Sequence, residues 1–257
     1  MIEVIDLSFS YSGREILKDI SFSAQKGEFL SVLGANGVGK STLFKCMINA
    51  LPGYTGKITV DGTDTRSMKV RELARHIAYI PQMSASSFNY SVEDIVLMGT
   101  TASLGGIRSP GVKEKQRAEQ AMERVGIAHL RKRCFHHLSG GESQLVIIAR
   151  ALAQEAEILL LDEPGSALDF GNQMLILEQA RKLASEGYTV IQTTHDPEKA
   201  HIFSDRIIAM KEGRILSQGT PSEVLSGENI ELMYGIPVDV TSLYDDKVRV
   251  FMPFKMI

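Results

Sequence analysis

One short stretch constrains this chain more than any other part of its sequence. An apolar run at residues 29–33 leads into a glycine-rich loop that ends in a lysine and two hydroxyl residues. The loop fits the pattern G-x-x-x-x-G-K-[ST] and consists of Gly34, Ala35, Asn36, Gly37, Val38, Gly39, Lys40, Ser41 and Thr42. This pattern indicates a phosphate site where a strand passes into a helix. The loop therefore predicts a nucleotide-binding α/β protein.

The residue types of the loop suit a bound triphosphate. Glycines let the backbone curl so that successive amides point at one phosphate, and a helix that begins near Gly39 adds the positive end of its dipole. Lys40 would neutralise the β- and γ-phosphates of ATP, and the Ser41 hydroxyl would bind Mg²⁺. The alternative is a glycine-rich turn that binds nothing. The spacing of the glycines differs from G-x-G-x-x-G, which disfavours an NAD enzyme.

Two carboxylates follow a second apolar run, at residues 158–161. Ligands of open α/β sheets bind beyond the carboxyl ends of the strands, where Asp162 and Glu163 are expected to lie. Asp162 can hold Mg²⁺, and Glu163 can orient or deprotonate the attacking water. In isolation, solvated acids at a strand end would explain the pair equally well. A phosphate loop in the same chain favours the catalytic interpretation.

The rest of the chain predicts an α/β fold class with a mostly parallel sheet. Residues 2–9 and 16–22 alternate as strands do, and residues 57–60 end in a tight Asp61-Gly62 turn. Apolar runs alternate with helical stretches later in the chain, at residues 77–80, 158–161, 188–193 and 206–210. The apolar spacing at residues 113–125 predicts a helix, and Thr220-Pro221 predicts a capped helix start.

Composition excludes several classes of protein. The 257 residues carry 28 basic and 31 acidic side chains, a net charge of −3, so no nucleic-acid partner is expected. No apolar run approaches the roughly 18–20 residues of a membrane span. The N-terminus lacks a basic segment followed by an apolar stretch, so we expect no secretory signal. Cys46 and Cys134 are expected to be reduced thiols in a cytosolic protein.

Two further motifs indicate a family. Leu138 and the four residues Ser139, Gly140, Gly141 and Glu142 precede a helical stretch, and His195 follows an apolar strand. With the phosphate loop and Asp162-Glu163, in this order, they resemble the nucleotide-binding ATPase of ABC transporters over nearly the whole chain. The resemblance implies a RecA-like P-loop NTPase core with a small antiparallel β subdomain and an inserted helical subdomain. We predict one domain, with its core at about 1–82 and 155–220, the helical subdomain at 83–154 and a C-terminal extension at 221–257.

The resemblance also implies roles for individual residues. Tyr11 would stack on adenine, Gln82 would reach Mg²⁺ and the attacking water, and His195 would contact the γ-phosphate. The signature residues Ser139, Gly140, Gly141 and Glu142 would contact an ATP held by the opposite subunit, and Ser166 and Asp169 would lie in a loop that crosses the dimer seam. A tyrosine near a turn or a histidine after a strand is more often structural when it occurs alone.

The chain departs from the family pattern at three positions. It carries Glu142 where glutamine is commoner, Leu145 where many relatives carry arginine, and Gly165 where threonine is usual. None of these departures removes a phosphate ligand. The resemblance therefore still implies ATP binding.

Partners follow from the same resemblance. One phosphate loop and one signature imply a homodimer that encloses two ATP molecules, bound to integral membrane permease subunits at the cytoplasmic face of the membrane. Residues 92–99, the stretch up to Pro110 and the segment 235–253 resemble the iron-chelate and cobalamin importer branch. That branch implies a siderophore, haem, cobalamin or an oxyanion as cargo and an extracytoplasmic substrate-binding protein.

Other proteins share the nucleotide chemistry. A soluble ATPase of this family that helps to assemble iron–sulfur clusters remains an alternative. A DNA-repair or chromosome-organising ATPase would need a long coiled coil between loop and signature, which this sequence lacks. A P-loop kinase would leave the signature and His195 unexplained.

Overall fold

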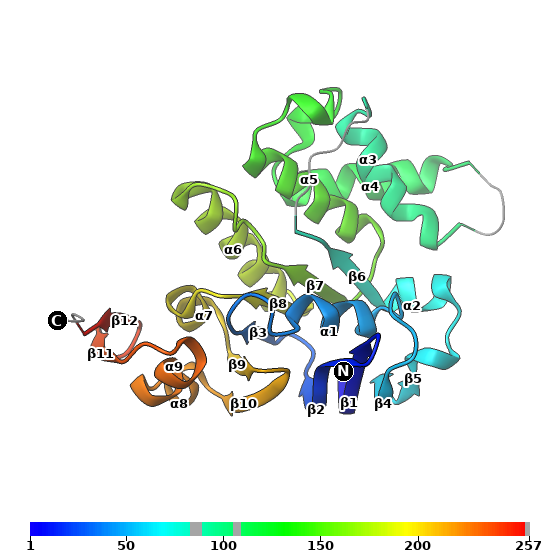
Figure 1. Ribbon diagram of the computed structural model, residues 1–257. Coiled ribbons are helices and arrows are strands. Elements are labelled where there is room, and N and C mark those ends of the chain that lie inside the picture. Colours follow the sequence, from blue (N-terminus) through cyan, green and yellow to red (C-terminus); the bar gives the residue numbers. More distant parts are fainter. Residues whose placement is uncertain (83–88, 105–108, 255–257) are drawn as a thin grey trace. The chain divides into compact units, whose positions relative to one another are not determined.

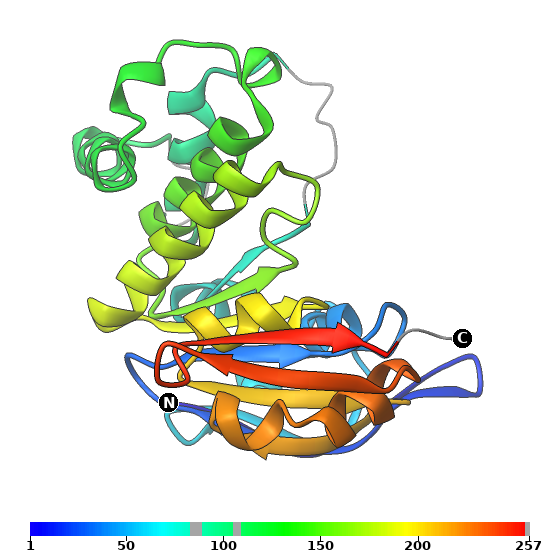
Figure 2. The same ribbon diagram turned by 90° about the vertical axis from the view of Figure 1, so that its left-hand side faces the viewer.

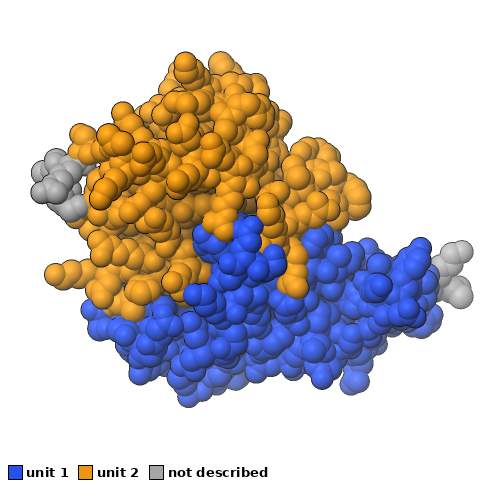
Figure 3. Space-filling model, turned by 180° about the vertical axis from the view of Figure 1, so that it is seen from behind, with its two compact units in different colours: residues 1–67, 183–257 blue, residues 68–182 orange. Residues whose placement is uncertain are grey.

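The computed structural model describes residues 1–82, 89–104 and 109–254. Its internal contacts divide the chain into two compact units. Unit 1 comprises Met1–Ser67 and Leu183–Ile257, and unit 2 comprises Met68–Lys182 (Figure 3). The predicted domain boundaries were drawn from the order of motifs in the sequence and not from internal contacts, so they stay a prediction. The predicted start of the helical insertion, near residue 83, and part of the stretch before Pro110 lie outside the described residues.

Unit 1 contains an antiparallel sheet in the order β2-β1-β4-β5. Its strands are β1 (Ile2–Tyr11), β2 (Arg14–Ala24), β4 (Thr55–Val60) and β5 (Thr63–Asp64). Strands were predicted here, but β1 ends two residues later, and β2 begins two residues earlier, than predicted. The reason is the two-residue turn at Ser12-Gly13, both with positive φ, which lets Tyr11 pair with Arg14.

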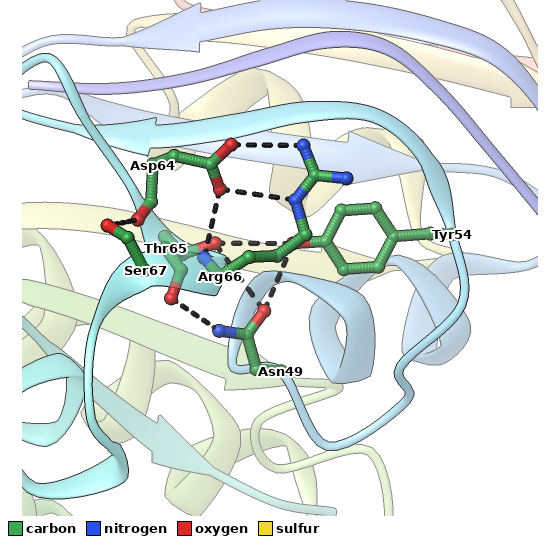
Figure 4. A network of polar contacts seen from close by, with 6 residues as sticks. All are labelled: Asn49, Tyr54, Asp64, Thr65, Arg66 and Ser67. Carbon is green, nitrogen blue, oxygen red and sulfur yellow. Dashed lines mark hydrogen bonds and ion pairs between the residues drawn. The ribbon is translucent and has the colours of Figure 1, made fainter.

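A polar network joins this sheet to the helix α1 (Lys40–Met47), which follows the phosphate loop (Figure 4). Asn49 donates to the Thr65 carbonyl at 2.7 Å and accepts from the Tyr54 hydroxyl at 3.0 Å. Arg66 pairs with Asp64 at 3.0 Å and its guanidinium lies 5.3 Å from the centre of the Tyr54 ring. The network fixes the carboxyl end of α1, and with it the helix that carries the loop.

Parallel strands form the second sheet of unit 1. The central strand β3 (Phe29–Leu33) is completely buried and pairs in parallel with both β8 (Thr189–Thr194) and β9 (Arg206–Lys211). Burial on both faces explains why four of its five residues are apolar. The exception, Ser31, is buried with hydrogen bonds to Ser204 and Gln192. Strand β10 (Arg214–Gly219), which was not predicted, pairs with β9 as a hairpin. Its turn at Glu212-Gly213 has two positive φ angles.

The C-terminal segment packs on this second sheet (Figures 1 and 2). Thr220 caps α8 (Pro221–Val224), as predicted, and α9 (Gly227–Tyr234) follows. A hairpin of β11 (Val238–Leu243) and β12 (Val248–Pro253) ends the described chain and lies against α7 (Pro197–Phe203). The helix α9 and this hairpin were not predicted. One apolar cluster joins α9 to β3 and β9 through Leu33, Ile207, Ala209, Ile230 and Met233.

Unit 2 combines two parallel strands with a group of helices. Strands β6 (Ile77–Ile80) and β7 (Ile158–Asp162) pair in parallel. The helices are α2 (Val70–His76), α3 (Val92–Met98), α4 (Val112–Arg124), α5 (Gly140–Ala153) and α6 (Phe170–Ser185), of which α3, α4 and α5 pack together. As predicted, the described residues between Ile80 and Ile158 form no strand apart from one bridge between Ser91 and Cys134.

The predicted α/β class is therefore confirmed, with mostly parallel strands, helices and a separate antiparallel sheet. In the described part of the chain, no helix is long and apolar enough to span a bilayer. Both cysteines are free thiols, as predicted.

Candidate functional site

The phosphate loop connects β3 to α1 through backbone conformations that favour glycine. Gly37 has a φ of 82° and Gly39 a φ of 110°. A Cβ on Gly39 would lie 2.9 Å from Leu17 Cδ2, and one on Gly34 would lie 2.6 Å from the Met210 carbonyl oxygen. The loop is therefore curled, with glycine required by close packing at positions 34 and 39 and favoured by a positive φ at positions 37 and 39.

Lys40 supplies a buried positive charge inside this loop. Only 5% of the residue is exposed, and its Nζ donates to the carbonyls of Gly34 at 2.8 Å and Ala35 at 3.1 Å. A buried ammonium needs such partners, and here they hold it beside the first turn of α1. The first turn of α1 contains no acidic residue that would repel a phosphate. It does contain Ser41, which is exposed. Curled backbone, helix start and cation together suit a phosphate.

Two more predicted residues belong to unit 1. Tyr11 ends β1 with 43% of its surface exposed, and its ring meets Phe9 edge to face at 4.8 Å. His195 follows β8 directly and is exposed. The carbonyl of the preceding residue, Thr194, accepts a hydrogen bond from the Gly34 amide at 3.2 Å. Residues 194–196, which we call the histidine turn, are thus joined to the start of the phosphate loop.

In unit 2, the predicted magnesium ligand is buried and hydrogen-bonded. Asp162 is the last residue of β7, is 4% exposed, and accepts from the Tyr79 hydroxyl at 3.0 Å. Burial and the Asp162 carboxylate raise the pKa of Tyr79, so the phenol stays a donor. Tyr79 was not predicted as a site residue. Its signal was its position as the one residue with a polar group in the apolar run 77–80.

Glu163 occupies a strained turn. Its φ of 47° lies in the left-handed region, which is uncommon for residues other than glycine and costs of order 1–3 kcal/mol. Gly165 follows at 75°, and the Ser166 amide donates to the Glu163 carbonyl at 3.2 Å. The side-chain amide of Gln82 donates to Ser166 Oγ at 3.1 Å. Unit 2 thus brings the predicted Gln82 next to the loop that holds Ser166.

The signature segment forms a capped helix start. The Ser139 Oγ accepts from the Glu142 amide at 3.2 Å, and Glu142 accepts from the Ser139 amide at 2.8 Å, a reciprocal capping box. The Ser139 amide lowers the pKa of Glu142, which also pairs with Arg133 at 3.2 Å. A glutamate therefore suits this position as well as a glutamine. Leu145 is 8% exposed, so that departure changes packing within α5.

The signature glycines lie against the loop before α6 and the first turn of that helix, also within unit 2. A Cβ on Gly140 would lie 2.6 Å from Leu168 Cδ2, and one on Gly141 would overlap the Asn172 side chain. Asp169 accepts hydrogen bonds from the Asn172 amide at 3.0 Å and from its side chain at 2.6 Å. The structure thus brings the signature together with the Ser166–Asp169 loop. Asn172 was missed, and no sequence signal marked it.

The predicted residues are divided between the units. Unit 1 holds Tyr11, the loop from Gly34 to Thr42, and His195; unit 2 holds Gln82, the signature, Asp162, Glu163, Ser166 and Asp169.

Comparison with known proteins adds relatives that span almost the whole chain. The family model described as ABC transporter matches residues 17–166. A hemin import ATP-binding protein, HmuV, of Deinococcus radiodurans is 40% identical over 93% of this chain and 92% of its own. A protein of Helicobacter pylori named a probable iron chelatin transport ATP-binding protein is 35% identical over 98% and 99%.

A solved structure agrees with these relatives. A chain described as a metal-chelate type ABC transporter in an inward-facing conformation superposes with a TM-score of 0.86 at 34% identity, over 98% of this chain and 96% of its own. The fold, the loop geometry and the relatives agree with the resemblance found in the sequence, and this chain therefore belongs to the ABC transporter family, as one of its ATP-binding ATPases.

Proposed function

We propose that this chain is the ATP-hydrolysing subunit of a membrane importer for hemin or a related iron chelate. The observation that carries the proposal is the match to proteins named for hemin import and iron chelatin transport over 93% and 98% of this chain. The match extends past the shared ATPase motifs into the C-terminal segment. A relative in nucleotide chemistry alone would not need to share that segment.

The loop geometry supports ATP as the nucleotide substrate and Mg²⁺ as its cofactor. The buried Lys40 ammonium lies in a curled loop at a helix start, and the buried Asp162 carboxylate ends a strand, as an oxygen ligand for a hard cation should. Ser41, Gln82 and Asp162 would hold Mg²⁺, which neutralises charge on the phosphates. Tyr11 would stack on the adenine, and the loop amides would bind the phosphates.

Three side chains would act at the γ-phosphate. Glu163 would deprotonate or orient the attacking water, because a carboxylate on a rigid turn can act as a general base. Gln82 would hold that water through its side-chain amide. His195 would donate a hydrogen bond to the γ-phosphate, where charge builds up during phosphoryl transfer.

We further propose that two copies of the chain close around two ATP molecules. Each signature would supply the amides of its α5 start to the ATP of the other copy. Hydrolysis would remove the γ-phosphate contacts and loosen the dimer, which would move the permease subunits that the dimer binds at the cytoplasmic face of the membrane. An extracytoplasmic binding protein would deliver the chelate.

Transport can be measured directly. The chain is expected to co-purify from membranes with a multispanning protein, and the complex in lipid vesicles should accumulate hemin or a ferric siderophore only when Mg²⁺ and ATP are present on the ATPase side. The same complex with ADP is the control. ATP hydrolysis that never yields accumulation of either probe would overturn the importer proposal while leaving the ATPase assignment in place.

Ser139→Arg tests the signature. The bulky cation should block the two-ATP dimer while ATP still binds each monomer, because Ser139 lies at the α5 start rather than in the phosphate loop. Size-exclusion chromatography of this variant in ATP, under conditions in which hydrolysis is slow, should then show a monomer. Ser91→Arg is the matched control, since Ser91 caps α3 of the same unit with a capping box of the same kind, formed with Asp94. A Ser139→Arg chain that dimerises normally with ATP would contradict the role of the signature.

A further inference from the structure

The C-terminal segment makes a direct contact with the histidine turn. The Tyr234 hydroxyl, at the end of α9, donates to the backbone carbonyl of His195 at 2.9 Å, across 39 residues of sequence. Both residues belong to unit 1. Gly235, with a φ of 74°, ends the helix immediately after the tyrosine and so fixes where it stops.

The histidine turn is fixed on either side of this carbonyl. Thr194 accepts from the Gly34 amide at 3.2 Å, and its hydroxyl accepts from the Asp196 amide at 3.1 Å. Asp196 in turn caps α7 by accepting from the Lys199 amide at 3.1 Å, and it pairs with the Lys199 ammonium at 2.6 Å. The His195 carbonyl and the Asp196 amide belong to one planar peptide unit, so the Tyr234 hydroxyl and the Thr194 hydroxyl bind this unit at its two polar groups.

Tyr234 packs against the same apolar cluster as the strand end that leads into the phosphate loop. Ile230 and Met233 of α9 belong to the apolar cluster that contains Leu33, the residue directly before Gly34, and Tyr234 packs against that cluster. Burial, followed by the nearby Asp196 carboxylate, raises the pKa of Tyr234, so the phenol keeps the proton that it donates. The tyrosine is therefore a fixed donor.

We propose that Tyr234 is a positioning residue for ATP hydrolysis, which holds the His195 peptide so that the imidazole is directed at the γ-phosphate. This inference rests on the proposed role of His195. It gives the C-terminal segment, which lies beyond the family model's match at residues 17–166, a part in the chemistry. A tyrosine that served stability alone would affect folding without a selective effect on turnover.

Tyr234→Phe removes the hydroxyl and keeps the ring in its cluster. Loss of one hydrogen bond that orients a reacting group should lower kcat by roughly threefold to tenfold, with KM for ATP and the affinity for ATP unchanged. Tyr244→Phe is the matched control, because Tyr244 is 77% exposed in the turn of the C-terminal hairpin and should keep wild-type kcat. Thermal unfolding of both variants checks that the fold is intact.

A double-mutant cycle separates the possible failures. In a His195→Ala background, Tyr234→Phe should cause no further loss of kcat, since the group that it positions is absent. Equal kcat for Tyr234→Phe and Tyr244→Phe, or the same fold loss with and without His195, would overturn the positioning role and leave the function of His195 intact. If His195→Ala alone hydrolyses ATP at the wild-type rate, the proposed role of His195 fails first and this inference with it.

Discussion

Glu163→Gln is expected to lower ATP turnover by about 10²–10⁴-fold while ATP still binds. The amide cannot accept the proton of the attacking water, whereas the loop and Lys40, the proposed phosphate ligands, are unchanged. With Mg²⁺ and ATP the variant should collect as a stable dimer, because the γ-phosphate contacts persist. Single-turnover hydrolysis and sizing in ATP measure the two effects.

The backbone at this position dictates the choice of variant. Because Glu163 has a φ of 47° and starts the turn closed by the Ser166 amide, glutamine keeps the length and shape of the side chain there. Glu155→Gln is the matched control. Glu155 is another glutamate of unit 2 with a positive φ, 60°, and pairs on the surface with Arg117 at 3.0 Å. A surface pair of this kind contributes about 0–1 kcal/mol, so turnover should not change.

Comparison of Glu163→Gln with Glu155→Gln tests whether Glu163 is the general base. Wild-type turnover in Glu163→Gln would exclude Glu163 as the general base. Equal losses in both variants would instead indicate that removal of any glutamate at such a turn damages the unit, and the effect could no longer be attributed to catalysis.

Local signals in the sequence predicted much of the fold. The strand at 29–33, the loop and a helix start near Gly39 were all predicted, and α1 begins at Lys40, because glycine spacing and a short apolar run depend on few distant contacts. The capped start at Thr220 was predicted for the same reason. Strand β10 and the C-terminal hairpin were missed, although Val238, Val240, Val248 and Val250 alternate along it. Their short, partly exposed strands give a weak apolar pattern.

The site was predicted less completely than the fold. Motif residues such as Lys40 and Asp162 are recognisable by type and spacing, but the residues that orient them are not. Asn172 binds Asp169 as a local contact at the start of α6, three positions away, and its position next to Gly141 is what the sequence does not show. Tyr79 and Tyr234 bind residues 83 and 39 positions away, through hydrogen bonds that depend on how strands and helices pack. Such contacts follow from the tertiary structure, and a motif contains no record of them.

Lys40→Ala is expected to weaken ATP binding itself, in contrast to Glu163→Gln. A hydrogen bond to a charged group contributes about 1.5–3 kcal/mol, so the loss of this cation should raise the Kd for ATP by roughly 10- to 150-fold. Because Lys40 also binds the Gly34 and Ala35 carbonyls, the loop loses the partner that holds its curl. Titration of a fluorescent ATP analogue, displaced by ATP, gives the Kd.

Lys45→Ala is the matched control for this measurement. Lys45 is an exposed lysine on the same helix, five residues further on, so its removal changes the net charge equally without touching the loop. The melting temperature of Lys45→Ala should stay close to that of the wild type, whereas that of Lys40→Ala should fall, because the Gly34 and Ala35 carbonyls lose a donor. The Kd is therefore measured well below both melting temperatures, where both variants are folded. An unchanged Kd in Lys40→Ala would exclude Lys40 as a phosphate ligand. An equal rise in both variants would assign the effect to net charge, because Lys40 donates to the Gly34 and Ala35 carbonyls of the loop whereas Lys45 lies outside the loop.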